Sequence, residues 1–131
     1  MLVYAAAINA DSARSATARS LLRTTRRESC LSVQTLSEFS VVALRNGLPP
    51  DTCRVIVAEY RRSWTILLPD PATVELALTR VGQHSLSYWD SLLWAVAKQA
   101  DLTEILSEDG PIGTVVGGIL YRNPFSPRLS T

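Results

Sequence analysis

The sequence lacks several features that are typical of zinc-binding, secreted and membrane proteins. Its 131 residues include two cysteines and one histidine, without a CxxC pair, so a zinc site is not expected. The apolar start at residues 1–7 is too short to span a membrane, and no positive charges precede it as they would in a signal peptide. The expected location is therefore the cytoplasm, a reducing compartment.

An excess of charge of one sign is also lacking. The basic and acidic residues nearly balance, at a net charge of +1, so bulk charge does not indicate a polyanionic partner. Lys98 is the only lysine. Arginine suits bidentate contacts with phosphate, but a GC-rich gene would produce the same bias and is the simpler explanation. Four arginines share one side of a predicted helix, where a solvated face is favoured over a phosphate-binding one: Arg19, Arg23, Arg26 and Arg27.

What is present is typical of one globular domain spanning residues 1–131. The apolar fraction is 47% and the charged fraction 19%, and a chain of this length can bury a sizeable core. Helical segments alternate with short apolar ones, which predicts an α/β domain with a parallel sheet. Helices are expected at 12–27, 35–45, 51–62, 71–81 and 87–100, strands at 30–33, 64–68, 104–107 and 119–122, and a loop at 110–118.

Three acidic residues fall where parallel sheets bind ligands. Glu38 is expected in the first turn of the helix after the first strand, Asp90 in the first turn of the apolar helix, and Asp109 just after a strand. The carboxyl ends of parallel strands form a crevice, so these side chains are expected to meet at one edge. Clustered carboxylates repel one another, and their usual reason to converge is a hard divalent cation such as Mg²⁺ or Mn²⁺. Such a cation polarises a phosphoryl group and activates water for phosphodiester hydrolysis.

A purely structural role is open for each of the three. The segments TLSE at 35–38 and SYWD at 87–90 match capping boxes, in which Glu38 or Asp90 would only bond the backbone at a helix start. Asp109 precedes Gly110 and fits a turn. Spacing alone leaves both interpretations open.

Several segments, taken together, resemble the PIN-domain family and in particular its VapC-type members. The segments are LVYA at 2–5, QTLSEF at 34–39, LSYWDSL at 86–92, LSED at 106–109, and GG at 117–118 followed by NPF at 123–125. They occur in the family's order over nearly the whole chain. No single motif is strongly specific, but the set is.

This resemblance implies a fold, an activity and partners. The fold is a three-layer α/β/α domain with a central parallel sheet. The activity is Mg²⁺- or Mn²⁺-dependent cleavage of RNA by the toxin of a VapBC toxin–antitoxin pair. Glu38, Asp90 and Asp109 match acidic positions that are catalytic and bind the metal, and Ser107 matches a position often filled by Thr or Ser. The implied partners are RNA, a cognate antitoxin and a second copy of the chain.

The sequence departs from the family at its front. The opening aspartate of the first motif would fall three residues before Met1, and the first strand would precede the motif's tail. We expect a misassigned start, with a truncated gene as the alternative. The corresponding alternative function is a catalytically impaired binding module.

The aromatic and sulfur-containing residues are expected to be structural. Trp89 and Trp94 lie on a helix that is apolar nearly all round, so a place in the core is favoured over stacking on bases. Cys30 and Cys53 are expected to be small core hydrophobes.

Overall fold

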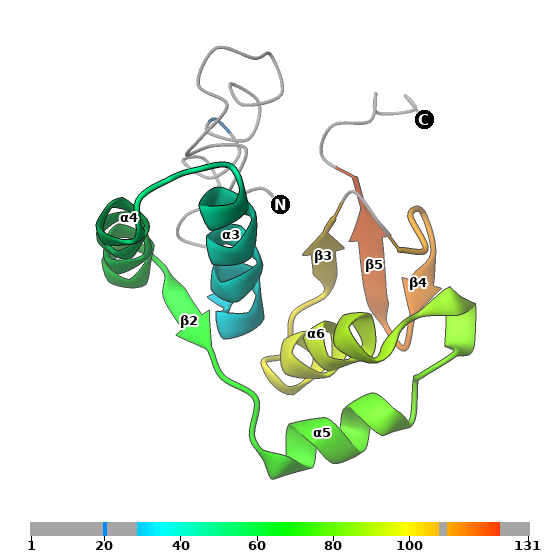
Figure 1. The fold of residues 1–131 in the computed structure, drawn as a ribbon. Coiled ribbons are helices and arrows are strands. Elements are labelled where there is room, and N and C mark those ends of the chain that lie inside the picture. Colours follow the sequence, from blue (N-terminus) through cyan, green and yellow to red (C-terminus); the bar gives the residue numbers. More distant parts are fainter. Residues whose placement is uncertain (1–19, 21–28, 108–109, 124–131) are drawn as a thin grey trace. The chain divides into compact units, whose positions relative to one another are not determined.

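Figure 1 shows the computed structural model of the chain, which describes Ser20, residues 29–107 and residues 110–123. The chain divides into two compact units, Met1–Leu67 and Leu68–Thr131. Of the helix expected at 12–27, only Ser20 is among the described residues, and it is helical. None of the helices that the structure describes is long and apolar enough to cross a membrane.

The first unit contains a parallel pair of strands joined by two helices. In chain order these are β1 (Cys30–Ser32), α3 (Val33–Arg45), α4 (Pro50–Ser63) and β2 (Thr65–Leu67). Leu31 of β1 lies opposite Ile66 of β2. Phe39 and Ala43 of α3 and Cys53 of α4 are buried together, which confirms the prediction for Cys53 and gives this unit a core of its own.

The start of α3 differs from the prediction for a local reason. Ser32 is the N-cap residue, because its Oγ accepts a hydrogen bond of 3.0 Å from the backbone N–H of Thr35. The helix therefore begins at Val33, and the predicted range of 35–45 starts too late. Glu38 consequently lies in the second turn of α3 and not in the first.

The second unit packs two helices with a three-stranded sheet. In chain order its elements are α5 (Pro71–Leu78), the short 3₁₀ turn η1 (Gln83–Ser85), α6 (Tyr88–Gln99), β3 (Glu104–Leu106), β4 (Val115–Val116) and β5 (Ile119–Arg122). The strand order is β3-β5-β4, with β3 parallel and β4 antiparallel to β5. Asp70 and Thr73 form a capping box that starts α5, and α5 packs against α6.

The core of the second unit is organised around Trp94. This side chain is 1% exposed, and its Nε1 donates a 2.9 Å hydrogen bond to the carbonyl oxygen of Val116. The guanidinium of Arg80 lies 4.7 Å from the ring centroid on its face, a cation–π arrangement. The core prediction for Trp94 is confirmed, and α6 is thereby fixed to the β4–β5 hairpin.

The predicted loop at 110–118 is partly wrong, because it contains β4. Val116 pairs with Ile119, and Gly117 and Gly118 between them have φ values of 52° and 88°. Two consecutive positive φ values are what a tight two-residue hairpin turn requires, and glycine adopts them without strain. A Gly-Gly pair between two apolar runs is a known hairpin signal, so the sequence did contain the information.

The class prediction is confirmed. Helices alternate with strands, and β1–β2 and β3–β5 pair in parallel, in agreement with a three-layer α/β/α fold. The strand predicted at 119–122 has those ends, and the other predicted elements are present with shifts of one to three residues at one or both ends. The largest shift is in the helix predicted at 71–81, which ends at Leu78 and continues into a turn at Gly82, where φ is 82°.

Candidate functional site

Asp90 lies in the first turn of α6, as predicted, and is exposed. Ser87 is the N-cap residue, and its Oγ accepts from the backbone N–H of Asp90 at 3.2 Å. The same hydroxyl donates to Oδ2 of Asp90 at 2.9 Å. The capping role predicted for Ser87 is therefore confirmed. The Asp90 carboxylate, however, bonds the hydroxyl of Ser87 and not its backbone N–H as a capping box requires. The reciprocal bond of a capping box, from the Ser87 backbone, is not among those of the described residues. A carboxylate at this end of a helix is also favoured by the helix dipole.

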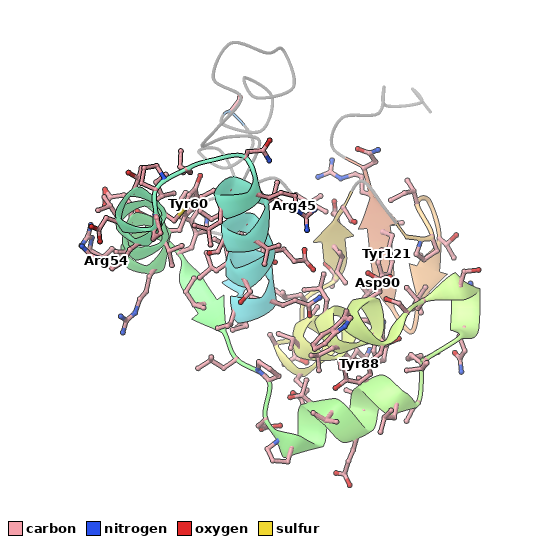
Figure 2. The ribbon with its side chains drawn as sticks, in the orientation of Figure 1. Arg45, Arg54, Tyr60, Tyr88, Asp90 and Tyr121 are labelled. Atoms are coloured by element: carbon pink, nitrogen blue, oxygen red, sulfur yellow. The ribbon has the colours of Figure 1, made fainter. Side chains whose placement is uncertain are left out.

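Tyr121 of β5 lies within the electrostatic reach of Asp90, and both are labelled in Figure 2. The tyrosine is 4% exposed, and its hydroxyl has no hydrogen-bond partner among the described residues. Burial, and secondarily the negative charge of Asp90, raise the pKa of Tyr121 to about 12. The phenol is therefore protonated at any physiological pH. Sequence reasoning missed this residue, because a tyrosine in a short apolar strand looks like an ordinary core residue.

Asp109 itself lies outside the described residues, but the residues on either side of that gap are placed. The backbone N–H of Ser107 donates to the carbonyl oxygen of Arg122 at 2.9 Å. Gly110 lies against the Tyr121 ring, since a Cβ on Gly110 would be 3.4 Å from the ring carbon Cδ2. The chain thus leaves and rejoins the described structure beside β5.

Glu38 lies on α3 of the first unit and is exposed. The capping box predicted for TLSE is wrong, because Ser32 and not Thr35 caps the helix. The Glu38 Oε1 instead accepts a 3.2 Å hydrogen bond from Nε2 of Gln34, one turn earlier. This removes the simplest structural explanation for the glutamate. Glu38 and Asp90 belong to different units, and their separation stays a prediction.

The described residues do not by themselves form a metal site. Within residues 29–107 and 110–123, no three His, Cys, Asp or Glu side chains gather closely enough to hold an ion. None of the ion pairs in that part of the chain involves Glu38 or Asp90; the basic partners belong to Asp51, Glu59 and Glu104. The two candidate carboxylates are thus not neutralised by any described basic side chain. The prediction that they and Asp109 bind a cation is untested.

The prediction that Trp89 lies in the core is wrong. It is 62% exposed, although its helix was expected to bury it. The residue lies in the first turn of α6, before the helix reaches the core, and its ring meets the half-buried Tyr88 edge to face at 5.1 Å. The helical pattern alone did not show that an exposed tryptophan directly precedes Asp90.

Comparison with known proteins gives one finding that bears on the site. Residues 2–113 match the model of the PIN domain family. The matched range includes Glu38, Asp90 and Asp109 together. No curated protein matches the sequence.

Proposed function

The chain belongs to the PIN domain family, whose members are generally nucleases, and from this premise we propose that it is a metal-dependent endoribonuclease acting as the toxin of a VapBC-type pair. The observation that carries the proposal is the state of Asp90. Its carboxylate is exposed at a helix start, has no basic partner among the described residues, and lies near a buried hydroxyl with no described partner.

The proposed ligands are Glu38, Asp90 and Asp109. Their donor atoms are all carboxylate oxygens, which suit Mg²⁺ or Mn²⁺ better than zinc. A bound cation would supply polarisation of the scissile phosphate and an activated water. The protein's own contribution is orientation, since the Ser87 hydroxyl fixes one oxygen of Asp90. The assignment of Asp109 rests on its motif, LSED at 106–109.

Trp89 supports a single-stranded substrate. Proteins recognise unpaired bases by stacking them on exposed aromatic rings, each worth about 1–3 kcal/mol. Trp89 presents its ring to solvent next to Asp90, and Tyr88 limits the orientations that the ring adopts. A base stacked on Trp89 would lie one residue from the carboxylate that is proposed to bind the cation, which in turn would polarise the scissile phosphate.

The proposal also includes a cognate antitoxin and a homodimer in the cytoplasm. An antitoxin that offers an arginine to these carboxylates would block the site by a charge-assisted bond. A small reading frame just upstream of the gene, whose product co-purifies with this chain, is the expected finding.

The test is RNA cleavage by the purified chain in the presence of Mg²⁺. Asp90→Asn should lower the rate by at least ~100-fold, since outer-shell changes at metal sites already cost ~10–100-fold. Asp101→Asn, a change of the same type at an exposed aspartate of the same unit, should leave the rate unchanged. Trp89→Ala should weaken binding of a single-stranded RNA while the metal dependence remains.

Two other outcomes have defined meanings. RNA binding by the chain without cleavage would identify it as a binding module. Cleavage that survives a chelating agent, or that Asp90→Asn leaves intact, would contradict the metal-dependent mechanism.

A further inference from the structure

The hydroxyl of Tyr121 is a buried polar group that the proposed chemistry does not use. Burying a hydroxyl without a hydrogen bond is unfavourable, so native structures rarely do it without a reason. Tyr121 is 4% exposed, and no described residue bonds its hydroxyl. Ser91 of α6 also has an unpartnered buried hydroxyl. A helical serine, however, reaches the carbonyl oxygen four residues back by a small rotation.

The Tyr121 ring has no comparable freedom. Its backbone is held on both sides, since its carbonyl oxygen accepts from the N–H of Gly113 at 2.8 Å and its own N–H donates to Thr114 at 3.0 Å. On the other edge of β5, Tyr121 lies opposite Ile105 of β3. A Cβ built on Gly110 would lie 3.4 Å from the ring carbon Cδ2, so the backbone of Gly110 passes beside the ring. The strand that carries the hydroxyl is therefore held in place, and a partner would have to reach it there.

The surroundings define what that partner is. Asp90 is the titratable group among the described residues whose charge acts on Tyr121. A free phosphate or another anion would be repelled by this carboxylate, whereas a cation would be attracted. Mg²⁺ and Mn²⁺ keep several of their waters when they bind one or two carboxylates, and those waters are strong hydrogen-bond donors. A water bound to a cation at Asp90 would be a donor of the kind that the phenol oxygen lacks among the described residues.

We propose that Tyr121 is a positioning residue for the cation at Asp90, its oxygen accepting a hydrogen bond from a water in the cation's hydration shell. This inference rests on the proposed function, because it assumes that Asp90 binds the metal. It adds a residue of β5 that contacts neither the RNA nor the metal directly. Its role is to hold one water, and through it the cation, in a fixed orientation.

The experiment measures the binding of Mn²⁺ to the full chain without RNA, with electron paramagnetic resonance as the readout. Tyr121→Phe removes only the hydroxyl oxygen and should weaken Mn²⁺ binding by ~10–100-fold, the effect typical of outer-shell partners. Its thermal stability should equal or exceed that of the wild type, because an unpartnered hydroxyl is lost. Tyr60→Phe, the same change in the first unit, is the matched control and should bind Mn²⁺ normally.

The outcomes separate this inference from the proposed function. If Asp90→Asn loses Mn²⁺ and Tyr121→Phe binds it as well as the wild type, the Tyr121 role is wrong and the metal site stands. If the wild type does not bind Mn²⁺, both fail. A second measurement needs no variant: bound Mn²⁺ should broaden the ring signals of Tyr121 in NMR spectra far more than those of Tyr60. Equal broadening would overturn the inference.

Discussion

One hydroxyl at the start of α6 has two functions. The Ser87 Oγ accepts the backbone N–H of Asp90 and donates to the carboxylate of the same residue. The first bond caps the helix, a contribution of about 1 kcal/mol, and the second fixes one carboxylate oxygen. The same hydroxyl therefore starts the helix and orients the proposed metal ligand. A change at Ser87 should affect both the stability of α6 and the orientation of the Asp90 carboxylate.

Tyr121 leads to a prediction about alkaline pH. Its pKa is about 12 in the folded chain against an ordinary value of 10.0. As the pH rises from 10 toward 12, the unfolded chain releases a proton that the folded chain retains, so the free energy of unfolding falls over this range. Below the ordinary value the proton is bound in both states and the residue has no effect on the pH dependence.

The measurement is urea unfolding of the wild type and Tyr121→Phe at a series of alkaline pH values. The wild type should lose stability more steeply with pH than the variant. A shallower slope should remain in Tyr121→Phe, because burial also raises the pKa of Tyr60. Identical slopes for the two proteins would show that Tyr121 titrates normally in the folded state.

At the scale of the elements, the β4–β5 hairpin depends on Gly117. A Cβ at this residue would lie 2.7 Å from Cζ2 of Trp94 and 2.8 Å from Nη2 of Arg80, and the residue has positive φ. Gly117→Ala combines backbone strain with overpacking and should destabilise the chain by about 2–5 kcal/mol. The neighbouring Gly118→Ala should cost only about 1–2 kcal/mol, because its Cβ meets the flexible end of Lys98.

Thermal or urea unfolding of the two glycine variants gives the comparison. The difference between them isolates the clash with Trp94, since both positions have positive φ. Equal losses of stability would mean that the tight approach of the hairpin to α6 contributes little. The indole hydrogen bond to Val116 would then be the main link between them.

The sequence predicted the existence and type of most elements better than their ends. Apolar spacing located α3, α4 and α6 because their buried faces repeat at the helical period. The start of α3 was missed because Ser32 and Thr35 are both good caps and only the folded backbone selects between them. The burial of Trp89 was wrong because a helix's apolar pattern does not show that its first turn extends past the core.

The candidate site was predictable only as a set of residues. Motif order identified Glu38 and Asp90, and the structure confirms that both are exposed on helices, with Asp90 at a helix start. The involvement of Tyr121 could not be predicted, because it depends on how β5 packs beneath α6 and not on any local pattern. The convergence of the carboxylates depends on contacts across the whole chain, which local spacing does not determine.

At the scale of the whole molecule, the two units each have a hydrophobic core, and Leu68 between them is 73% exposed. Under the proposed function, a cation bound at Asp90 should stabilise the second unit by mass action.

The presence of separate cores has a calorimetric consequence. Because each unit buries its own core, calorimetry should be used to test whether the chain unfolds in one transition or two, since two-state behaviour requires one cooperative core. Saturating Mn²⁺ should raise the temperature of the transition that includes the second unit, and Asp90→Asn should abolish this rise. A chelating agent should reverse it, so the heat resistance of the protein would depend on its supply of divalent ions.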